Sequence, residues 1–157
     1  MELRAHHLLC SVLYGGKGYS EGFVNNMNGI VANIKKGTTL RIKKSPDIIC
    51  SQCPNAKRDG SCALDDEDKQ TSDKRSIVGD DQTVKSLDSY IMEEFGLTED
   101  EEYDSKELFS AISEKITEEF FNSCCETCRW YKSGLCSFDR YVNKLPEVLG
   151  MNNDAAE

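Results

Sequence analysis

LRAHHLLCSVLYGGKGYSEGF, residues 3–23, places both histidines of the chain, His6 and His7, shortly before Cys10. At about 100° per residue, the leucines and valine of this stretch fall on one arc of a helix, and the histidines and the cysteine fall on the adjacent arc. The stretch therefore predicts a helix from about Leu3 to Tyr14. That helix would pack its apolar arc into the core and present two imidazoles beside a thiol.

The overall composition is that of one small globular domain. The chain has 157 residues, of which 38% are hydrophobic and 30% charged. Its net charge of -9 and pI of about 4.8 disfavour nucleic acids and anionic lipid surfaces as partners. No apolar run approaches the roughly 18 residues of a membrane span, and the first residues lack the pattern of a secretory signal. We therefore expect a cytoplasmic protein with no nucleic-acid or membrane partner.

Eight cysteines are the outstanding feature, because a reducing cytoplasm makes disulfides rare. Most of them form two matched groups, CSQCPNAKRDGSC and CETCRWYKSGLC, which each contain C-x2-C, a longer excursion, and a glycine two residues before a third cysteine. Two residues between cysteines let both thiolates reach one metal from a tight turn. Metal ligation is thus favoured over disulfides or inert buried thiols. The predicted ligands are Cys50, Cys53, Cys62, Cys125, Cys128 and Cys136.

Each group lacks one ligand, because a tetrahedral metal or a four-iron cluster uses four protein ligands. Cys10, together with His6 or His7, is a ready source of the missing ligands. Cys124, adjacent to Cys125, is either a substitute ligand or a bystander. The histidines also have a plainer interpretation, as core or helix-end residues held by a backbone carbonyl. Spacing alone does not choose between iron–sulphur and zinc.

Further elements follow from apolar spacing and from capping residues. TTLRIKK, residues 38–44, alternates and predicts a short strand, with DIIC, residues 47–50, as one candidate partner. The expected helices are one capped by Ser20 and ending at Gly37, one from Val84 to Phe95, one capped by Asp104 that runs through Phe120 as the longest of the chain, and one capped by Ser137 with Pro146 kinking or ending it.

We therefore expect a mainly α protein: a small single-domain helical fold with a short β element and two cysteine-rich metal-binding loops. This domain covers residues 1–150. Residues 65–80 begin with DDEDKQTSDK, which has no apolar residue and is typical of a solvated loop or linker. Residues 151–157 are expected to form a frayed tail.

The glycine-rich loop before the second helix could bind an anion. Amide groups at a helix start and the lysine of the loop would both favour a phosphate or a carboxylate. The plainer interpretation is a tight turn that needs positive φ angles. The candidate anion-binding residues are Gly16, Lys17, Gly18, Tyr19 and Ser20.

The segments LRAHHLLC, GGKGYSEGFVNNM, PDIICSQCP and CETCRWYKSGLC, in this order, resemble domain-of-unknown-function family 1284. The resemblance covers nearly the whole chain, from Leu3 to Cys136. It implies an iron–sulphur protein of bacterial or archaeal type, in which the family cysteines correspond to Cys10 and to the six cysteines of the two groups. Cys124 is then an extra cysteine, and Arg129 stands where the family often has proline. The resemblance carries no reaction with it.

Three functional hypotheses follow. The leading one is a cytoplasmic iron–sulphur protein with one or two 4Fe–4S clusters, acting in electron transfer or as an accessory to a redox enzyme, with an acidic surface suited to a redox partner protein. The second is an enzyme in which an iron with only three cysteine ligands binds a small anionic substrate and His6 or His7 donates a proton. The third is an interaction module stabilised by zinc.

Overall fold

The computed structural model describes residues 1–16, 20–53, 84–125, 131 and 133–150. Within these residues the fold is mainly helical with a small three-stranded sheet, which confirms the expected fold class. The elements are β1 (Glu2–Arg4), α1 (His7–Leu13), α2 (Glu21–Lys36), β2 (Thr39–Lys43), the 3₁₀ helix η1 (Ile49–Gln52), α3 (Val84–Phe95), β3 (Glu102–Asp104), α4 (Ser105–Lys115), α5 (Glu118–Cys125) and α7 (Phe138–Val148). The expected acidic loop, 65–80, and the tail, 151–157, lie outside the described residues.

The first residues form a strand, so the prediction of a helix beginning at Leu3 is wrong. β1 pairs in parallel with β2, and Leu3 lies opposite Ile42. The Ala5 amide then donates to the Lys43 carbonyl at 3.1 Å and continues the ladder by one residue. Both paired side chains are fully buried, so burial against the neighbouring strand overrides the helical periodicity of the segment.

β2 is the central strand of the sheet and confirms the alternation read from the sequence. Leu40 and Ile42 are fully buried, whereas Arg41 between them is exposed. β3 pairs with β2 on the other side in antiparallel orientation, with Tyr103 opposite Leu40. The segment 47–50 is not a partner strand, because its last residues belong to η1. That correction matters for the site, since η1 carries the first cysteines.

The helix caps read from the sequence are present. The side chains of Ser20, Asp104 and Ser137 accept hydrogen bonds from the amides three residues on, at 3.1, 3.0 and 3.2 Å. Pro146 lies inside α7, which continues to Val148.

The helix expected to run unbroken through Phe120 is instead divided, and that prediction is wrong. α4 ends at Lys115, where Ile116 adopts an extended backbone conformation. A new helix, α5, begins after Thr117. The Oγ1 of Thr117 accepts from the Phe120 amide at 3.1 Å and caps this helix. Among the described helices the longest is therefore α2, with 16 residues.

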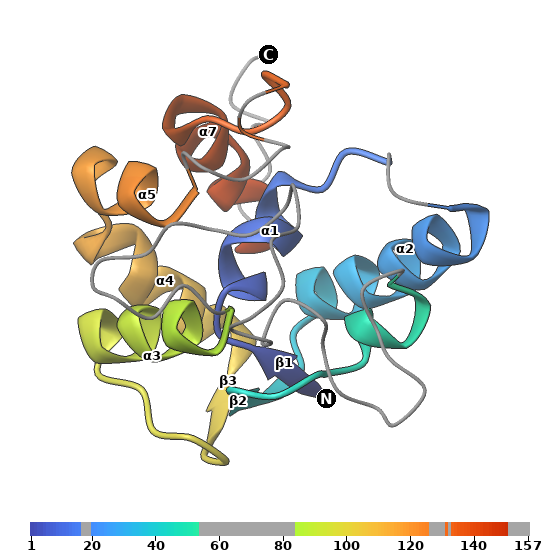
Figure 1. The fold of residues 1–157 in the computed structure, drawn as a ribbon, viewed down its shortest axis with the longest axis horizontal. Coiled ribbons are helices and arrows are strands. Elements are labelled where there is room, and N and C mark those ends of the chain that lie inside the picture. Colours follow the sequence, from blue (N-terminus) through green and yellow to red (C-terminus); the bar gives the residue numbers. More distant parts are fainter. Residues whose placement is uncertain (17–19, 54–83, 126–130, 132, 151–157) are drawn as a thin grey trace, which may run out of the picture.

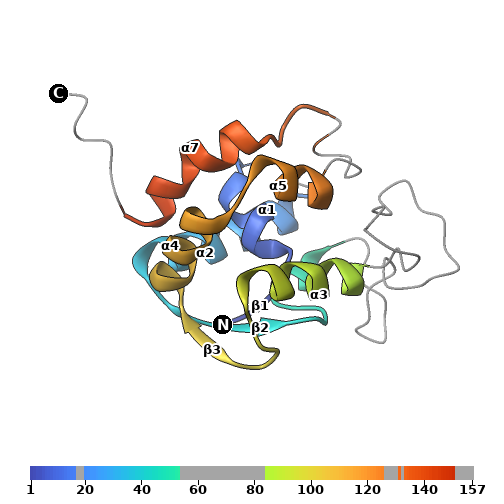
Figure 2. The same cartoon turned by 90° about the vertical axis from the view of Figure 1, so that its left-hand side faces the viewer.

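Helix α1 lies at the centre of the molecule, with helices α2, α3, α5 and α7 around it (Figure 1). Figure 2 shows the helices gathered on one side of the three-stranded sheet. Residues from every layer, including Leu3, Leu8, Phe109 and Tyr141, belong to one hydrophobic cluster. None of the described helices is both long and apolar enough to span a bilayer. The central position of α1 places its two histidines and its cysteine where all the other elements meet.

Candidate metal centre

A buried ion pair anchors the first histidine. Arg4, at the end of β1, is fully buried, and its Nε donates to Asp88 Oδ2 on α3 at 2.6 Å. The other carboxylate oxygen, Oδ1, accepts from the His6 amide at 2.9 Å and lies 2.8 Å from His6 Nδ1. A carboxylate can only accept here, so Nδ1 carries the proton. Burial raises the pKa of Asp88, and the charge of Arg4 opposes that rise.

A second carboxylate holds the second histidine in the same way. Asp47 Oδ2 lies 2.6 Å from His7 Nδ1 and accepts from the Arg4 backbone amide at 2.6 Å. Its Oδ1 accepts from the amides of Ile49 and Cys50, at 2.9 and 3.2 Å, so it caps the start of η1. The same oxygen accepts from the Cys50 thiol at 3.3 Å. One side chain thus positions both His7 and the first cysteine.

The charges of this group are strongly perturbed. Burial alone would raise the pKa of Asp47, but the charge and hydrogen bond of His7, with the Arg4 amide, hold it well below its usual range. Burial and then the charge of Asp47 raise the pKa of the Cys50 thiol well above its usual range. Without a metal, therefore, the site pairs a carboxylate with a protonated thiol.

His7, Asp47 and Cys50 have donor atoms within 4.8 Å of one another, which is close enough for one metal centre. Asp47, however, already accepts five hydrogen bonds through its two oxygens. A carboxylate has about four lone-pair positions, so little of it remains for a metal. Metal-bound histidines usually donate their second ring N–H to a carboxylate. Asp47 therefore fits the role of orienting His7, whose Nε2 faces away from it.

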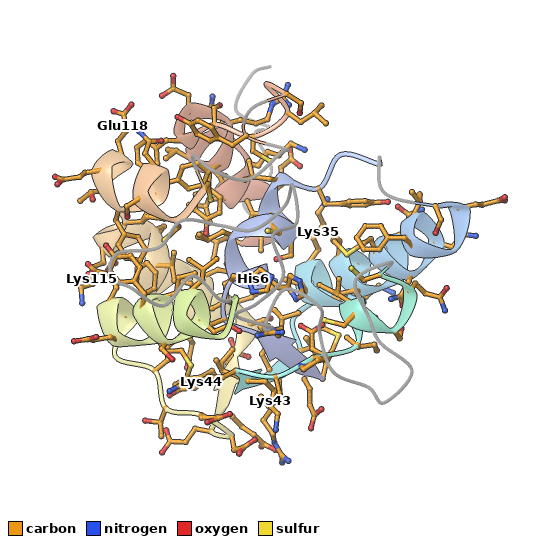
Figure 3. The ribbon with its side chains drawn as sticks, in the orientation of Figure 1. His6, Lys35, Lys43, Lys44, Lys115 and Glu118 are labelled. Atoms are coloured by element: carbon orange, nitrogen blue, oxygen red, sulfur yellow. The ribbon has the colours of Figure 1, made fainter. Side chains whose placement is uncertain are left out.

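The two imidazoles form a close pair in the interior. Their ring centroids lie 4.1 Å apart with planes inclined by 51°. Figure 3 shows His6 near the middle of the molecule, below α1 and between α2 and α3. Both rings are thus held by buried carboxylates and packed against each other, an arrangement with little rotational freedom.

The predicted cysteine ligands separate into two regions. Cys50 and Cys53 are free, half-buried thiols at η1, and Cys50 Sγ lies within 4.8 Å of a ring nitrogen of His7. Cys125 ends α5, and its charge and that of Cys10 both add to the effect of burial in raising the pKa of the Tyr141 hydroxyl. Cys10 and Cys125 therefore both lie near Tyr141 on α7.

The remaining predicted residues are placed only in part. Cys136 is partly buried against the core, two residues before α7, and Cys124 is almost fully buried. Gly16 has a φ of 87°, which fits the tight-turn interpretation, and Ser20 caps α2. Cys62, Cys128, Lys17, Gly18 and Tyr19 lie outside the described residues. Anion binding by the glycine loop stays a prediction.

Three residues of the network, Arg4, Asp47 and Asp88, do not stand out in the sequence analysis. Asp88 does leave a signal, since it sits next to Leu87 and three before Ile91 on the apolar arc of α3, where a charge needs a partner. Asp47 leaves another, three residues before Cys50, at the position of a cap for the cysteine turn. Arg4 leaves none while it is assigned to a helix.

Comparison with known families matches residues 18–134 to the family described as "Protein of unknown function (DUF1284)". No curated protein and no solved structure matches the chain. The matched region contains Asp47, Asp88, the first cysteine group, and Cys125 and Cys128 of the second group. It begins after the histidines and Cys10, and it ends before Cys136.

Replacing Arg4 by methionine is expected to lower the free energy of unfolding by about 3–5 kcal/mol, because Asp88 would remain buried without a compensating charge. Arg41→Met is the matched control, since Arg41 makes an exposed ion pair with Glu102 at 2.9 Å and should change stability little. Urea unfolding of both variants measures the difference. Equal effects of the two substitutions would contradict the proposed role of the buried pair.

Asp47→Asn is expected to remove a pH-dependent part of the stability of the metal-free protein. The folded-state pKa of Asp47 lies below its ordinary value of 3.8, so the carboxylate stabilises the fold above that pH and loses this effect as the pH falls below it. The stability difference between wild type and variant should therefore be largest near neutral pH and shrink in acid. Asp104→Asn, which keeps an N-cap acceptor, should match the wild type at neutral pH. A difference that does not change with pH would rule this out.

Proposed function

This chain belongs to the DUF1284 family, and from that premise and the geometry at η1 we propose that it is a metal-binding protein whose cysteine groups hold iron–sulphur centres. One observation carries the proposal: Asp47 joins the imidazole of His7 to the turn that bears Cys50 and Cys53. Buried ionisable groups with strongly perturbed pKa values cluster at functional sites, which supports the proposal.

The first centre would use His7, Cys50, Cys53 and Cys62 as ligands. In a 3₁₀ helix, side chains three residues apart lie on the same side, so the turn of η1 can direct the thiols of Cys50 and Cys53 together. Asp47 holds His7 beside them. Cys62, from the same sequence group, would supply the third thiolate.

The Cys50 thiol supports this role through its protonation. Burial and Asp47 keep it a thiol in the protein without metal. A cysteine that binds a metal must lose its proton, so the metal and the proton compete for this sulphur. Binding should release that proton, and the positive charge of the metal would replace it beside Asp47.

The second centre would use Cys10 with Cys125, Cys128 and Cys136. Cys10 and Cys125 both act on the hydroxyl of Tyr141, whose side chain is fully buried. His7 and Cys10 lie three residues apart on the same side of helix α1, so one short helix would serve both centres. This distribution gives four ligands to each and leaves Cys124 as a bystander.

Iron–sulphur clusters are our first candidate because both groups present C-x2-C thiolates and the chain is rich in such thiols. Zinc is the alternative for the first centre, since three cysteines and one histidine are a common structural zinc set. An open iron that binds an anionic substrate is less favoured, because His7 supplies the fourth donor. We propose electron transfer with a redox partner protein as the role, in the cytoplasm, where thiols stay reduced.

Anaerobically purified protein is expected to contain iron and acid-labile sulphide. Cys50→Ser should lose about half of both, because one of two centres would lack a thiolate. Ser51→Ala is the matched control. Ser51 is exposed on the same turn and, within the described part of the chain, bonds only to the Ile48 carbonyl and the Asn26 side-chain amide. A colourless protein that contains zinc and no sulphide would reject the iron–sulphur proposal and favour zinc.

A pair of single and double variants tests the assignment of ligands to centres. Cys10→Ser should also lose about half of the metal, and the double variant with Cys50→Ser should lose nearly all of it. If both cysteines served one centre, the double variant would retain as much metal as either single variant. Cys124→Ala should retain the full metal content, as measured by elemental analysis of the folded protein.

A further inference from the structure

One buried hydroxyl on helix α1 has no hydrogen-bond partner among the described residues. Ser11 lies on α1 and is 3% exposed, and among the described residues its Oγ is a buried side-chain oxygen with no hydrogen-bond partner. Such groups are rare in folded proteins, because a buried hydroxyl without a partner keeps the full cost of losing water. The absence of a partner therefore calls for an explanation.

The position of Ser11 indicates what the partner could be. It lies one helical turn after His7, and side chains four residues apart occupy the same face of a helix. A serine inside a helix can donate to the carbonyl four residues earlier, which here belongs to His7. That bond is not formed, so the hydroxyl proton can be donated to another acceptor on the His7 face.

The neighbours of Ser11 along the buried part of α1 cannot accept this proton. The side chains of Leu8 and Val12 are apolar and buried. A bridging water would itself need two to four polar partners. A bound group with negatively charged sulphur atoms next to His7 would supply an acceptor directly, with no bridging water.

We propose that Ser11 donates a hydrogen bond to a sulphur of the group bound at the His7 centre, and so tunes the properties of that group. The inference rests on the proposed function. Hydrogen bonds to sulphur stabilise the more negative, reduced form of an iron–sulphur cluster and raise its reduction potential. Ser11 would therefore be a positioning and tuning residue, and it would not be a ligand.

The inference predicts that Ser11→Ala has opposite effects in the two states of the protein. In the metal-free protein, alanine removes an unsatisfied hydroxyl and suits a helix, so Tm should rise by roughly 2–6 °C. In the protein reconstituted with Fe²⁺ and sulphide, the loss of the hydrogen bond should shift the midpoint potential to more negative values.

Ser105→Ala is the matched control, because Ser105 is a fully buried serine with its partners in place. Its Oγ accepts from the Thr38 amide at 3.0 Å and donates to the Ile34 carbonyl at 3.4 Å. Its replacement should lower Tm and leave the midpoint potential unchanged. The comparison separates the loss of a structural hydroxyl from the loss of a donor to the bound group.

The outcomes distinguish the inference from the function on which it rests. If the wild type binds iron and Ser11→Ala leaves the midpoint potential unchanged, the inference is wrong and the proposed function stands. A lower Tm of the metal-free variant would also overturn the inference, because the hydroxyl would then have a structural partner. If the protein binds zinc instead, Ser11→Ala should weaken its zinc affinity in competition with a chelator. A wild type that binds neither metal overturns both proposals.

Discussion

The buried ion pair between Arg4 and Asp88 is the constraint on which the rest of the structure depends. It joins the end of β1 to α3, 84 residues further along the chain, and neither side chain is exposed to water. Removing two charges from water is costly, and their attraction repays this cost only when further hydrogen bonds satisfy them. Here the His6 backbone and ring satisfy Asp88, and the Lys44 carbonyl accepts from Arg4 Nη2 at 3.2 Å. The hydrogen bonds from His6 thus offset part of the cost of burying the ion pair.

Local features of the sequence predict much of the fold but not its centre. Caps such as Ser20 and the alternation of β2 act over a few residues, so they can be recognised without tertiary information. The strand β1 could not be predicted from local features, because its pairing with β2 spans about 40 residues and the segment also has a good helical pattern. The break between α4 and α5 is also not evident from the sequence, because the apolar periodicity continues across it although Thr117 caps a new helix there.

The candidate site, too, can be predicted from the sequence only in part. The cysteines can be recognised as candidate ligands from their spacing and from the proposed cytoplasmic setting. The histidines can be recognised from their proximity to Cys10 in the sequence. What spacing does not reveal is which donors share a centre. The assignment proposed above rests on Asp47, which links His7 to η1, and on the proximity of Cys10 and Cys125 to Tyr141. The two look-alike cysteine groups would then differ in their fourth donor, an imidazole in one and a thiolate in the other. A neutral imidazole leaves less negative charge on a centre than a thiolate does, so the two centres would differ in reduction potential.

The contacts that assemble the His7 site join residues 40 to 84 positions apart in the chain. Contacts of such long range form late in folding, because the chain must first lose the entropy of closing large loops. During synthesis on the ribosome, Arg4 and both histidines emerge well before Asp47, and Asp88 later still. The nascent chain would therefore lack the complete pair of carboxylate anchors for His6 and His7 until Asp88 of α3 has joined the others.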